Sequence, residues 1–311
     1  MLPFKLIYHH GYDLNLGGHV FPSQKYRMVR EQLQAEAFAA PGDFMEPDPA
    51  TLEDLLLVHE RGWITRLLEG TLDRNELARL EIPYSKKMAQ AFVLSAGGSI
   101  LAARCALRDG VACNIGGGFH HAYPGHGEGF CAIHDVAVAI RRVQKDRLIE
   151  RAMVIDTDVH HGNGTAAIFE HDPSVFTLSI HQYYNYPQFK PPSSVDIHLE
   201  NGVGDAEYCQ LLGEACQKAL DEFQPQLVMY VAGADPYMHD QLGGLALTID
   251  GLKSRDHLVF ELAREHQAPV ATTFAGGYAR DINDTVTIHA NTVKAAAEIL
   301  RAKLGEHTAH P

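Results

Sequence analysis

The sequence predicts an α/β fold in which an open parallel β-sheet is flanked by helices. Two observations support this prediction. Short apolar runs with the length of buried strands alternate along the chain with longer stretches of helical periodicity. Several apolar runs also end in glycines and polar residues, which is typical of strands whose carboxyl ends carry functional groups. No linker, repeat or low-complexity segment is evident, so residues 1–311 are expected to form a single domain.

The N-terminal third of the chain predicts one strand followed by helices. Residues 4–8 are a short apolar run that becomes polar too soon for a signal peptide, and they indicate a first strand. Residues 24–36 place apolar side chains on one helical face. Thr51 with Asp54 resembles a capping box and predicts the start of a helix. Further helices are expected over residues 62–68 and over the alanine-rich residues 85–107.

From residue 111 onward, strands and helices alternate, which favours a parallel sheet. Strands are expected over residues 111–115, 152–158, 175–180, 226–232 and 269–274. Helices are expected over residues 129–143, 164–170, 206–222, 248–265 and 290–304. Residues 182–205 are rich in Tyr, Pro and Asn and are expected to form a loop.

Composition narrows the classes of function. The net charge of −13 argues against direct nucleic-acid binding and permits a cationic substrate, such as a lysine-bearing peptide or a polyamine. No apolar run reaches the roughly 18 residues of a membrane span, so no membrane association is expected. The five scattered cysteines form no CxxC pair, which suits buried thiols in a reducing compartment, and we expect a cytoplasmic protein.

The segment from Ile155 to Gly164 ends an apolar strand with two aspartates and two histidines. Alternate residues of an extended strand face the same way, so Asp156, Asp158 and His160 are expected to share one side. Carboxylate and imidazole groups are ligands that zinc and some other divalent metals accept. The segment therefore predicts two of the three ligands of a hydrolytic metal ion.

Asp235 is the candidate for the third ligand, because it follows the apolar strand over residues 226–232. An aspartate before a proline is also a common turn former. The clusters around His120, Asp158 and Tyr278 each follow a strand too, and the carboxyl edge of an α/β sheet is where ligands bind. One histidine and two aspartates would leave a metal position open for water, as in catalytic sites.

Two histidines and a tyrosine are candidates for the proton chemistry. His120 and His121 follow three glycines, which allow close backbone approach to a ligand. Imidazoles titrate in the range required of a general base and acid, and Asp156 is placed to orient one of them. Tyr278 follows two glycines and offers a hydrogen-bond donor to a developing oxyanion.

Taken together, these motifs resemble the zinc-dependent histone deacetylase family, which has the arginase–deacetylase fold. The resemblance covers nearly the whole chain in the family's order, and the short length and Asn163 are more similar to bacterial and class IV-like members. The motifs that carry it are GGGFHHA (116–122), GEGFCAIHDVAVAI (127–140), VIDTDVHHGNGT (154–165), TLSIH (177–181), AGADP (232–236) and AGGY (275–278).

The resemblance implies roles for individual residues. It implies that Zn²⁺, or Fe²⁺ in its place, is bound by Asp158, His160 and Asp235. His121 is the implied general base and acid, Asp156 supports His120, and Tyr278 polarises the acyl carbonyl. Gly129 and Phe130 are implied to line an acyl-lysine tunnel, with the Gly129 carbonyl accepting the substrate amide N–H. A structural K⁺ site is implied for Asp156, Asp158, His160 and Ser179.

Two positions depart from the family pattern. Asn163 stands where many members have an aspartate that supports the second histidine, and an amide cannot raise the pKa of His121 as a carboxylate would. His134 stands where an asparagine is common, with no effect that the sequence reveals. The segment before Pro83 does not align clearly, so no residue there is assigned to substrate recognition.

The function expected from the sequence is metal-dependent hydrolysis of an acyl-amide, most simply the deacetylation of acyl-lysine in a protein or peptide. One alternative is deacetylation of acetylated polyamines or other small acetyl-amines by the same groups. An arginase-like di-manganese ureohydrolase would need a second ligand set, and a catalytically silent scaffold would not need the intact ligands and Tyr278. Acyl preference and oligomeric state are not encoded in any motif.

Overall fold

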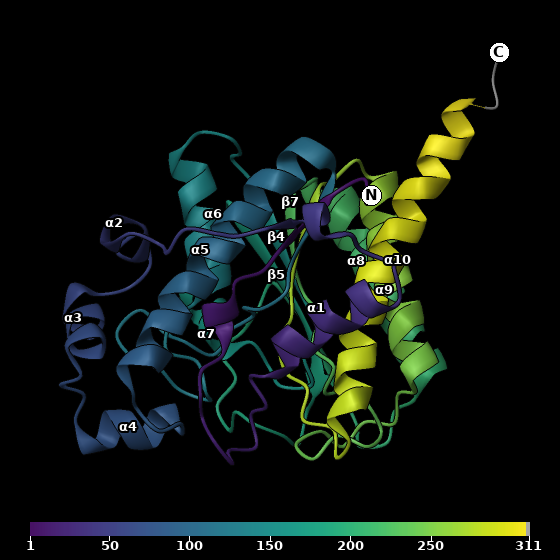
Figure 1. The fold of residues 1–311 in the computed structure, drawn as a ribbon. Coiled ribbons are helices and arrows are strands. Elements are labelled where there is room, and N and C mark those ends of the chain that lie inside the picture. The colour runs from purple at the N-terminus through teal and green to yellow at the C-terminus, as the bar shows by residue number, and fades with distance from the viewer. Residues whose placement is uncertain (309–311) are drawn as a thin grey trace.

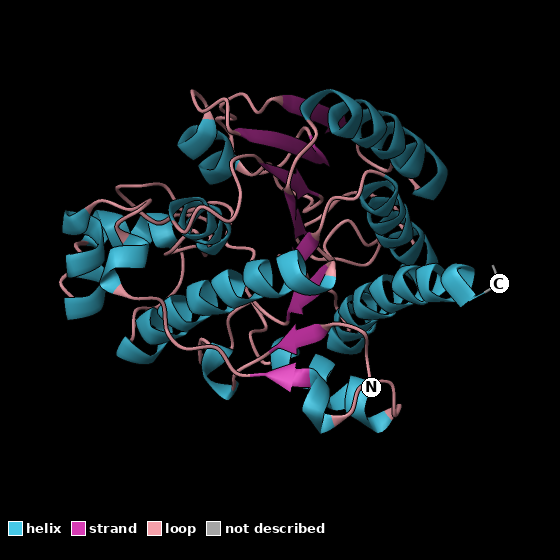
Figure 2. Ribbon diagram, turned by 90° about the horizontal axis from the view of Figure 1, so that it is seen from above, coloured by secondary structure: helices cyan, strands magenta, loops and turns pink. Residues whose placement is uncertain are grey.

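In the computed structural model, an eight-stranded parallel sheet forms the centre of the molecule and helices cover both of its faces (Figures 1 and 2). The structure describes residues 1–308, with side chains described as far as residue 301. The strand order is β2-β1-β3-β8-β7-β4-β5-β6, and all neighbouring strands are parallel. This architecture confirms the predicted fold class. The strands are β1 (Lys5–Ile7), β2 (Phe44–Met45), β3 (Val111–Asn114), β4 (Ala152–Asp156), β5 (Val175–Gln182), β6 (Val195–Leu199), β7 (Leu227–Val231) and β8 (Val270–Thr273).

The helices form two layers, one on each face of the sheet (Figure 2). One layer contains α5 (Lys86–Asp109), α6 (Asp135–Lys145) and α7 (Asn163–Phe169). The other layer contains α1 (Lys25–Ala35), α8 (Asp205–Phe223), α9 (Ile249–Glu265) and α10 (Ile282–Thr308). Three short helices lie at the outer side of the first layer, namely α2 (Leu52–Leu55), α3 (Arg61–Glu69) and α4 (Arg74–Leu80).

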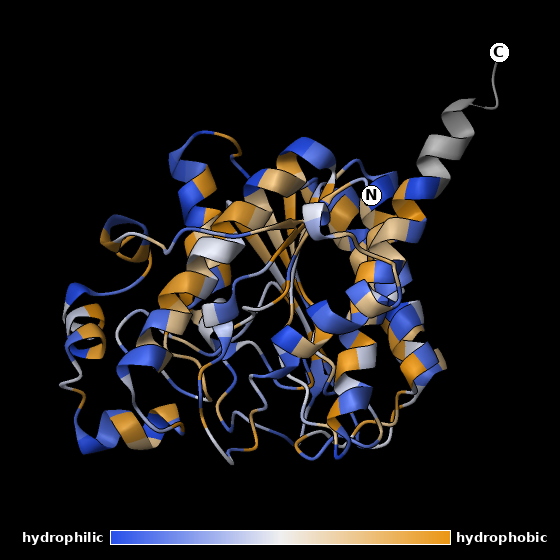
Figure 3. Cartoon of the chain, viewed as in Figure 1, coloured by the Kyte–Doolittle hydropathy of each residue, from blue (hydrophilic) through white to orange (hydrophobic). Residues whose placement is uncertain are grey.

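The central strands are mostly apolar because both faces of the sheet are covered. Every residue of β3, β4, β7 and β8 is buried. Figure 3 shows these strands as a hydrophobic centre between helices whose outer faces are hydrophilic. The core therefore holds the carboxyl ends of the central strands in fixed positions, and the functional residues follow these ends.

Helix α5 differs from the expectation that no segment is long and apolar enough to cross a membrane. By length and composition alone α5 meets that criterion, and 72% of its most apolar stretch is buried. It packs on the sheet beside α6, so its apolar surface belongs to the core. A Cβ atom at Gly97 of α5 would lie 1.9 Å from the backbone oxygen of Asp48, which shows how closely the chain packs against this helix.

Several predicted element boundaries were wrong. The helix expected from residue 129 begins at Asp135, because Gly129 and Phe130 have φ angles of 52° and 69°, which an α-helix does not allow. The expected loop over residues 182–205 contains the edge strand β6, a strand of five residues in which Val195, Ile197 and Leu199 alternate with polar residues. This short alternation lies within a segment rich in Tyr, Pro and Asn and was not predicted as a strand. Helix α10 begins at Ile282 rather than near residue 290, and the short elements β2 and α4 were missed.

Candidate active site

The candidate active site lies at the carboxyl edge of four strands that are adjacent in the sheet, in the order β3, β8, β7 and β4. His120 and His121 follow β3, and Asp158 and His160 follow β4. Asp235 follows β7, and the segment with Tyr278 follows β8. The structure therefore brings together the residues that the sequence placed at separate strand ends.

A glycine loop positions the two histidines that follow β3. Gly117 and Gly118 have φ angles of 73° and 79°, a conformation that favours glycine. The buried carboxylate of Asp135, at the start of α6, accepts hydrogen bonds from the backbone N–H groups of Gly118 and Phe119 at 3.1 and 2.8 Å. Because this carboxylate holds the loop from the helix side, the backbone at His120 is fixed against the sheet edge.

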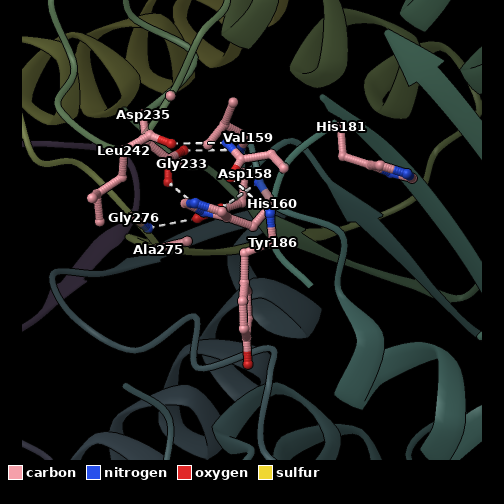
Figure 4. Close-up of polar contacts among 12 residues, drawn as sticks. Asp158, Val159, His160, His181, Tyr186, Gly233, Asp235, Leu242, Ala275 and Gly276 are labelled. Atoms are coloured by element: carbon pink, nitrogen blue, oxygen red, sulfur yellow. Dashed lines mark hydrogen bonds and ion pairs between the residues drawn. The ribbon is translucent and has the colours of Figure 1, made fainter. Parts of the chain in front are cut away.

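Asp158, His160 and Asp235 form a compact set of potential metal ligands (Figure 4). One ligand atom from each residue lies within 4.8 Å of the other two, and the residues are 2%, 7% and 0% exposed. The Nδ1 atom of His160 is 2.9 Å from Asp158 Oδ1 and 3.3 Å from Asp235 Oδ2. These are the three residues that the sequence predicted as ligands.

The surroundings of this set fit a divalent cation. Among the described residues, Asp235 Oδ2 is buried and has no hydrogen-bond partner. Burial and the neighbouring charge of Asp158 raise the pKa of Asp235 to about 7. A Cβ atom at Gly276 would lie 1.9 Å from Asp235 Oδ2, so only a glycine leaves this space free. A cation here would compensate the two buried carboxylates, which are costly to bury unpaired.

The two adjacent histidines are driven toward opposite protonation states. Nδ1 of His120 lies 2.7 Å from Asp156 Oδ2. Burial alone would lower the pKa of His120, but the charges of Asp156 and Asp158 outweigh it and raise this pKa to about 9. Burial, reinforced by the positive charges of His120 and His160, holds the pKa of His121 well below its usual range. Because these two pKa values are shifted in opposite directions, His120 is favoured as a cation and His121 as a neutral base.

Asn163 contacts His121, as the sequence suggested, and a further residue fixes the amide. Asn163 Oδ1 lies 2.7 Å from His121 Nδ1, and its Nδ2 donates to Glu128 Oε1 at 2.6 Å. Tyr186 and His126 also contact the Glu128 carboxylate, at 3.2 and 3.0 Å. Because a carboxylate only accepts, it turns the amide so that Oδ1 faces His121. The N–H of His121 then resides on Nδ1 and leaves a lone pair on Nε2.

A narrow cavity of about 180 Å³ leads to this cluster. Gly129 and Phe130, which the resemblance implied as tunnel residues, line it together with His121, His160 and Tyr278. The ring of Tyr278 lies 6.4 Å from that of His160 and 6.1 Å from that of Phe130. Tyr186, from the Tyr-rich segment that could equally have walled a channel or lain on the surface, also lines the cavity. Three lining residues were not predicted, because each comes from a segment without a chemical motif: Glu81, Asn185 and Leu242.

A buried lysine next to the segment of Tyr278 was also not predicted to belong to the site. The sequence assigned Lys25 no role, yet its Nζ atom donates to the backbone oxygen of Ala275 at 2.7 Å and lies 5.8 Å from the centre of the Tyr278 ring. Burial lowers its pKa to about 8, against the opposing charges of Asp235 and Asp158. Lys25, like His120, therefore places a positively charged group near the carboxylates of the candidate metal site.

The remaining predicted residues have mixed outcomes. Ser179 pairs with Asp156 in the β4–β5 register, but its hydroxyl is hydrogen-bonded to His181 Nδ1 at 2.9 Å, and the K⁺ site stays a prediction. His134 has a structural role that the sequence did not reveal. Its Nδ1 accepts from the backbone N–H of Ala137 to cap α6, and its Nε2 contacts Thr165 Oγ1.

Comparisons with known proteins agree with this geometry. Residues 19–293 match the histone deacetylase domain. The chain is 38% identical to an uncharacterized protein of Picosynechococcus over 95% of this chain and 99% of the relative. It is 36% identical to histone deacetylase 2 of Arabidopsis thaliana over 90% of this chain and 77% of the relative. A solved homologue of histone deacetylases from Aquifex aeolicus has the same fold, with a TM-score of 0.81, 24% identity and coverage of 94% and 83% of the two chains.

Proposed function

The chain belongs to the histone deacetylase family, and from this membership we propose that it is a Zn²⁺-dependent deacylase that removes acetyl groups from lysine side chains of proteins or peptides. Membership makes it a hydrolase of the amidohydrolase type, acting on an acetylated substrate. The choice of zinc follows from the ligand set of one imidazole and two carboxylates. Acetyl-lysine as the substrate rests on the shape of the cavity.

The observation that carries the proposal is the narrow cavity leading to Asp158, His160 and Asp235. Its volume of about 180 Å³ is small compared with the roughly 300–1,000 Å³ of a typical ligand pocket. Phe130, Tyr186 and Leu242 supply apolar walls. An unbranched aliphatic chain such as that of lysine can pass between such walls, whereas a branched or bulky amide cannot.

Zn²⁺ held by Asp158, His160 and Asp235 would act as a Lewis acid toward the acyl oxygen and make water a stronger nucleophile. His121 would accept a proton from the attacking water at Nε2, because Asn163 engages its Nδ1. As the C–O bond forms and the C–N bond breaks, His121 would return that proton to the leaving amine. The phenol of Tyr278 would donate a hydrogen bond to the oxyanion, and cationic His120 would stabilise the same charge. The carboxylic acid formed gives up the remaining proton of the water to the amine, so the products are a carboxylate and an ammonium ion.

A small acetylated polyamine is the second candidate substrate, and Glu81 supports it. This residue lines the cavity, and burial next to Glu128 raises the pKa of its carboxyl group. When ionised, the carboxylate would attract a second amine on a cationic substrate, in keeping with a net charge of −13. A lysine within a peptide has no such second amine.

The test is a panel of acyl-lysine peptides and acetylated polyamines, assayed with the metal-loaded wild type and with His121→Ala. We expect turnover of acetyl-lysine peptides by the wild type and loss of about 10²–10⁴-fold in the variant. Turnover of polyamines alone, with a selective loss in Glu81→Gln, would replace the main proposal by the second candidate. Absence of turnover of every substrate by the metal-loaded wild type would refute both.

A further inference from the structure

A second cluster of imidazole and carboxylate groups lies outside the active site, on the edge strands β5 and β6. In the parallel register, Ser179 pairs with Asp196 and His181 pairs with His198. Alternate residues of a strand face the same way, so these four side chains lie on one face of the strand pair. His161, which directly follows the predicted ligand His160, packs onto the same face. Figure 4 shows His181 apart from the group around His160.

The polar atoms of this cluster lie within reach of one another. His161 Nε2 is 3.1 Å from Asp196 Oδ1, and His181 Nε2 is 2.8 Å from His198 Nδ1. The ring centres of His161 and His181 are 4.6 Å apart. His161, His181 and Asp196 each offer a ligand atom within 4.8 Å of the other two. His161 and His181 are fully buried, and within the described part of the chain His161 Nδ1 has no hydrogen-bond partner.

We propose that His161, His181 and Asp196, with His198 as the fourth ligand, bind a divalent transition-metal cation of the Zn²⁺ type. In a tetrahedral zinc site with bonds of about 2.0–2.1 Å, the ligand atoms are separated by about 3.3 Å. The separations of 3.1 and 2.8 Å are shorter than that value by about 0.2 and 0.5 Å, so a small outward shift of the side chains would admit the ion. Ser179 Oγ lies 2.9 Å from His181 Nδ1 and can accept its N–H, which leaves Nε2 free to coordinate.

The surface next to the cluster gives a cation access to it. An open depression of about 990 Å³ is lined by Asp196 and His198 together with Tyr183, Tyr184 and Lys190. Three imidazoles and one carboxylate suit zinc, nickel or copper and disfavour Mg²⁺, which prefers oxygen ligands. The proposed ligand is therefore a divalent transition-metal ion that prefers imidazole nitrogen to oxygen ligands.

A cation in the His181 cluster would stabilise two segments that form the active site. His161 belongs to the segment that carries His160, and the loop between β5 and β6 carries Tyr186, which lines the substrate cavity. A cation bound by His161 and by residues of β6 would hold three elements together: the edge strand β6, the loop between β5 and β6, and the segment that carries His160. This role is structural, because the cluster is closed by four protein ligands and leaves no position for substrate.

Zinc stoichiometry measured by mass spectrometry on tag-free protein, after chelation and reloading with Zn²⁺, tests the proposal. We expect about two ions per chain in the wild type and about one in His198→Gln and in Asp196→Asn. His171→Gln, which changes an exposed histidine elsewhere, is the matched control and should retain both ions. Reloading should also raise the melting temperature less in His198→Gln than in the control.

Asp235→Asn separates this site from the proposed active site. This variant should still bind about one ion, and His198→Gln should then remove it. Loading with Mg²⁺ in place of Zn²⁺ should leave the cluster empty. An Asp235→Asn variant that binds no ion, or a His198→Gln variant that keeps the wild-type stoichiometry and melting temperature, would show that the cluster is a hydrogen-bond network only and overturn the proposal.

Discussion

Exchanging the amide of Asn163 with the carboxylate of Glu128 should move the pH dependence of the reaction. The two side chains share a hydrogen bond of 2.6 Å, and only Asn163 contacts His121. In the double variant Asn163→Asp/Glu128→Gln, a carboxylate would face His121 Nδ1, while the new amide at position 128 would still donate to it. The hydrogen bond between positions 128 and 163 is preserved, and the negative charge moves from position 128 to position 163.

The expected shift follows from the distance between the groups. A carboxylate bonded to the imidazole at 2.7 Å would place the two charges about 4 Å apart, worth about 4 kcal/mol at an effective dielectric constant near 20, or about three pKa units. Known carboxylate neighbours shift such groups by about one to three units. The pKa of His121, which burial now holds low, would therefore rise by about one to three units. The general base would then be protonated at higher pH, so the acidic limb of kcat/KM would move upward by the same amount.

Two single variants serve as controls for this shift. In Asn163→Asp alone, the new carboxylate would lie against Glu128, and two carboxyl groups this close share a proton, so the shift should be smaller. In Glu128→Gln alone, an amide that can both donate and accept replaces a carboxylate that only accepts. The amide of Asn163 is then no longer held with Oδ1 toward His121, and kcat should fall by about 10–100-fold. The pH profile should be measured over the full acidic range with each protein metal-loaded. An acidic limb that stays in place in the double variant would refute the role assigned to Asn163.

The remaining predictions concern metal binding, oxyanion stabilisation and packing. Asp235→Asn should lose more activity than the about 10–100-fold typical of an outer-shell change and should bind less Zn²⁺ in equilibrium dialysis; wild-type affinity would contradict the ligand assignment. Tyr278→Phe should lower kcat by about 10²–10³-fold with little change in KM, and a purely raised KM would show that the phenol only binds substrate. Gly97→Ala should lower the free energy of unfolding by about 1–3 kcal/mol in urea, since its Cβ would meet the backbone oxygen of Asp48. The control Gly42→Ala, with no described atom within 4 Å of the new Cβ, should be nearly neutral, and equal effects would refute the packing argument.

The fold class and the candidate metal ligands could be predicted from the sequence, because both follow from local patterns. Apolar runs that alternate with helical stretches specify a parallel sheet, and the sheet brings the carboxyl ends of neighbouring strands together. Asp158, His160 and Asp235 each stand a few residues past such an end, so their meeting was predictable without coordinates. The resemblance also singled out Asn163, where many family members have an aspartate, and the structure places its amide oxygen 2.7 Å from His121 Nδ1.

Tertiary structure decided what surrounds these residues, since those contacts join segments that no local pattern relates. Glu128 meets Asn163 across 35 positions, and Lys25 meets Ala275 across 250. Glu81 reaches the cavity from the end of α4, a helix too short and polar to be predicted. The cluster around His181 depends on the parallel register of β5 and β6, which pairs His181 with His198 and which no local pattern specifies. The sheet fixes the positions of the strand ends. The orientation and protonation of the side chains there, and the access of substrate to them, depend on how loops that are distant in sequence pack around them.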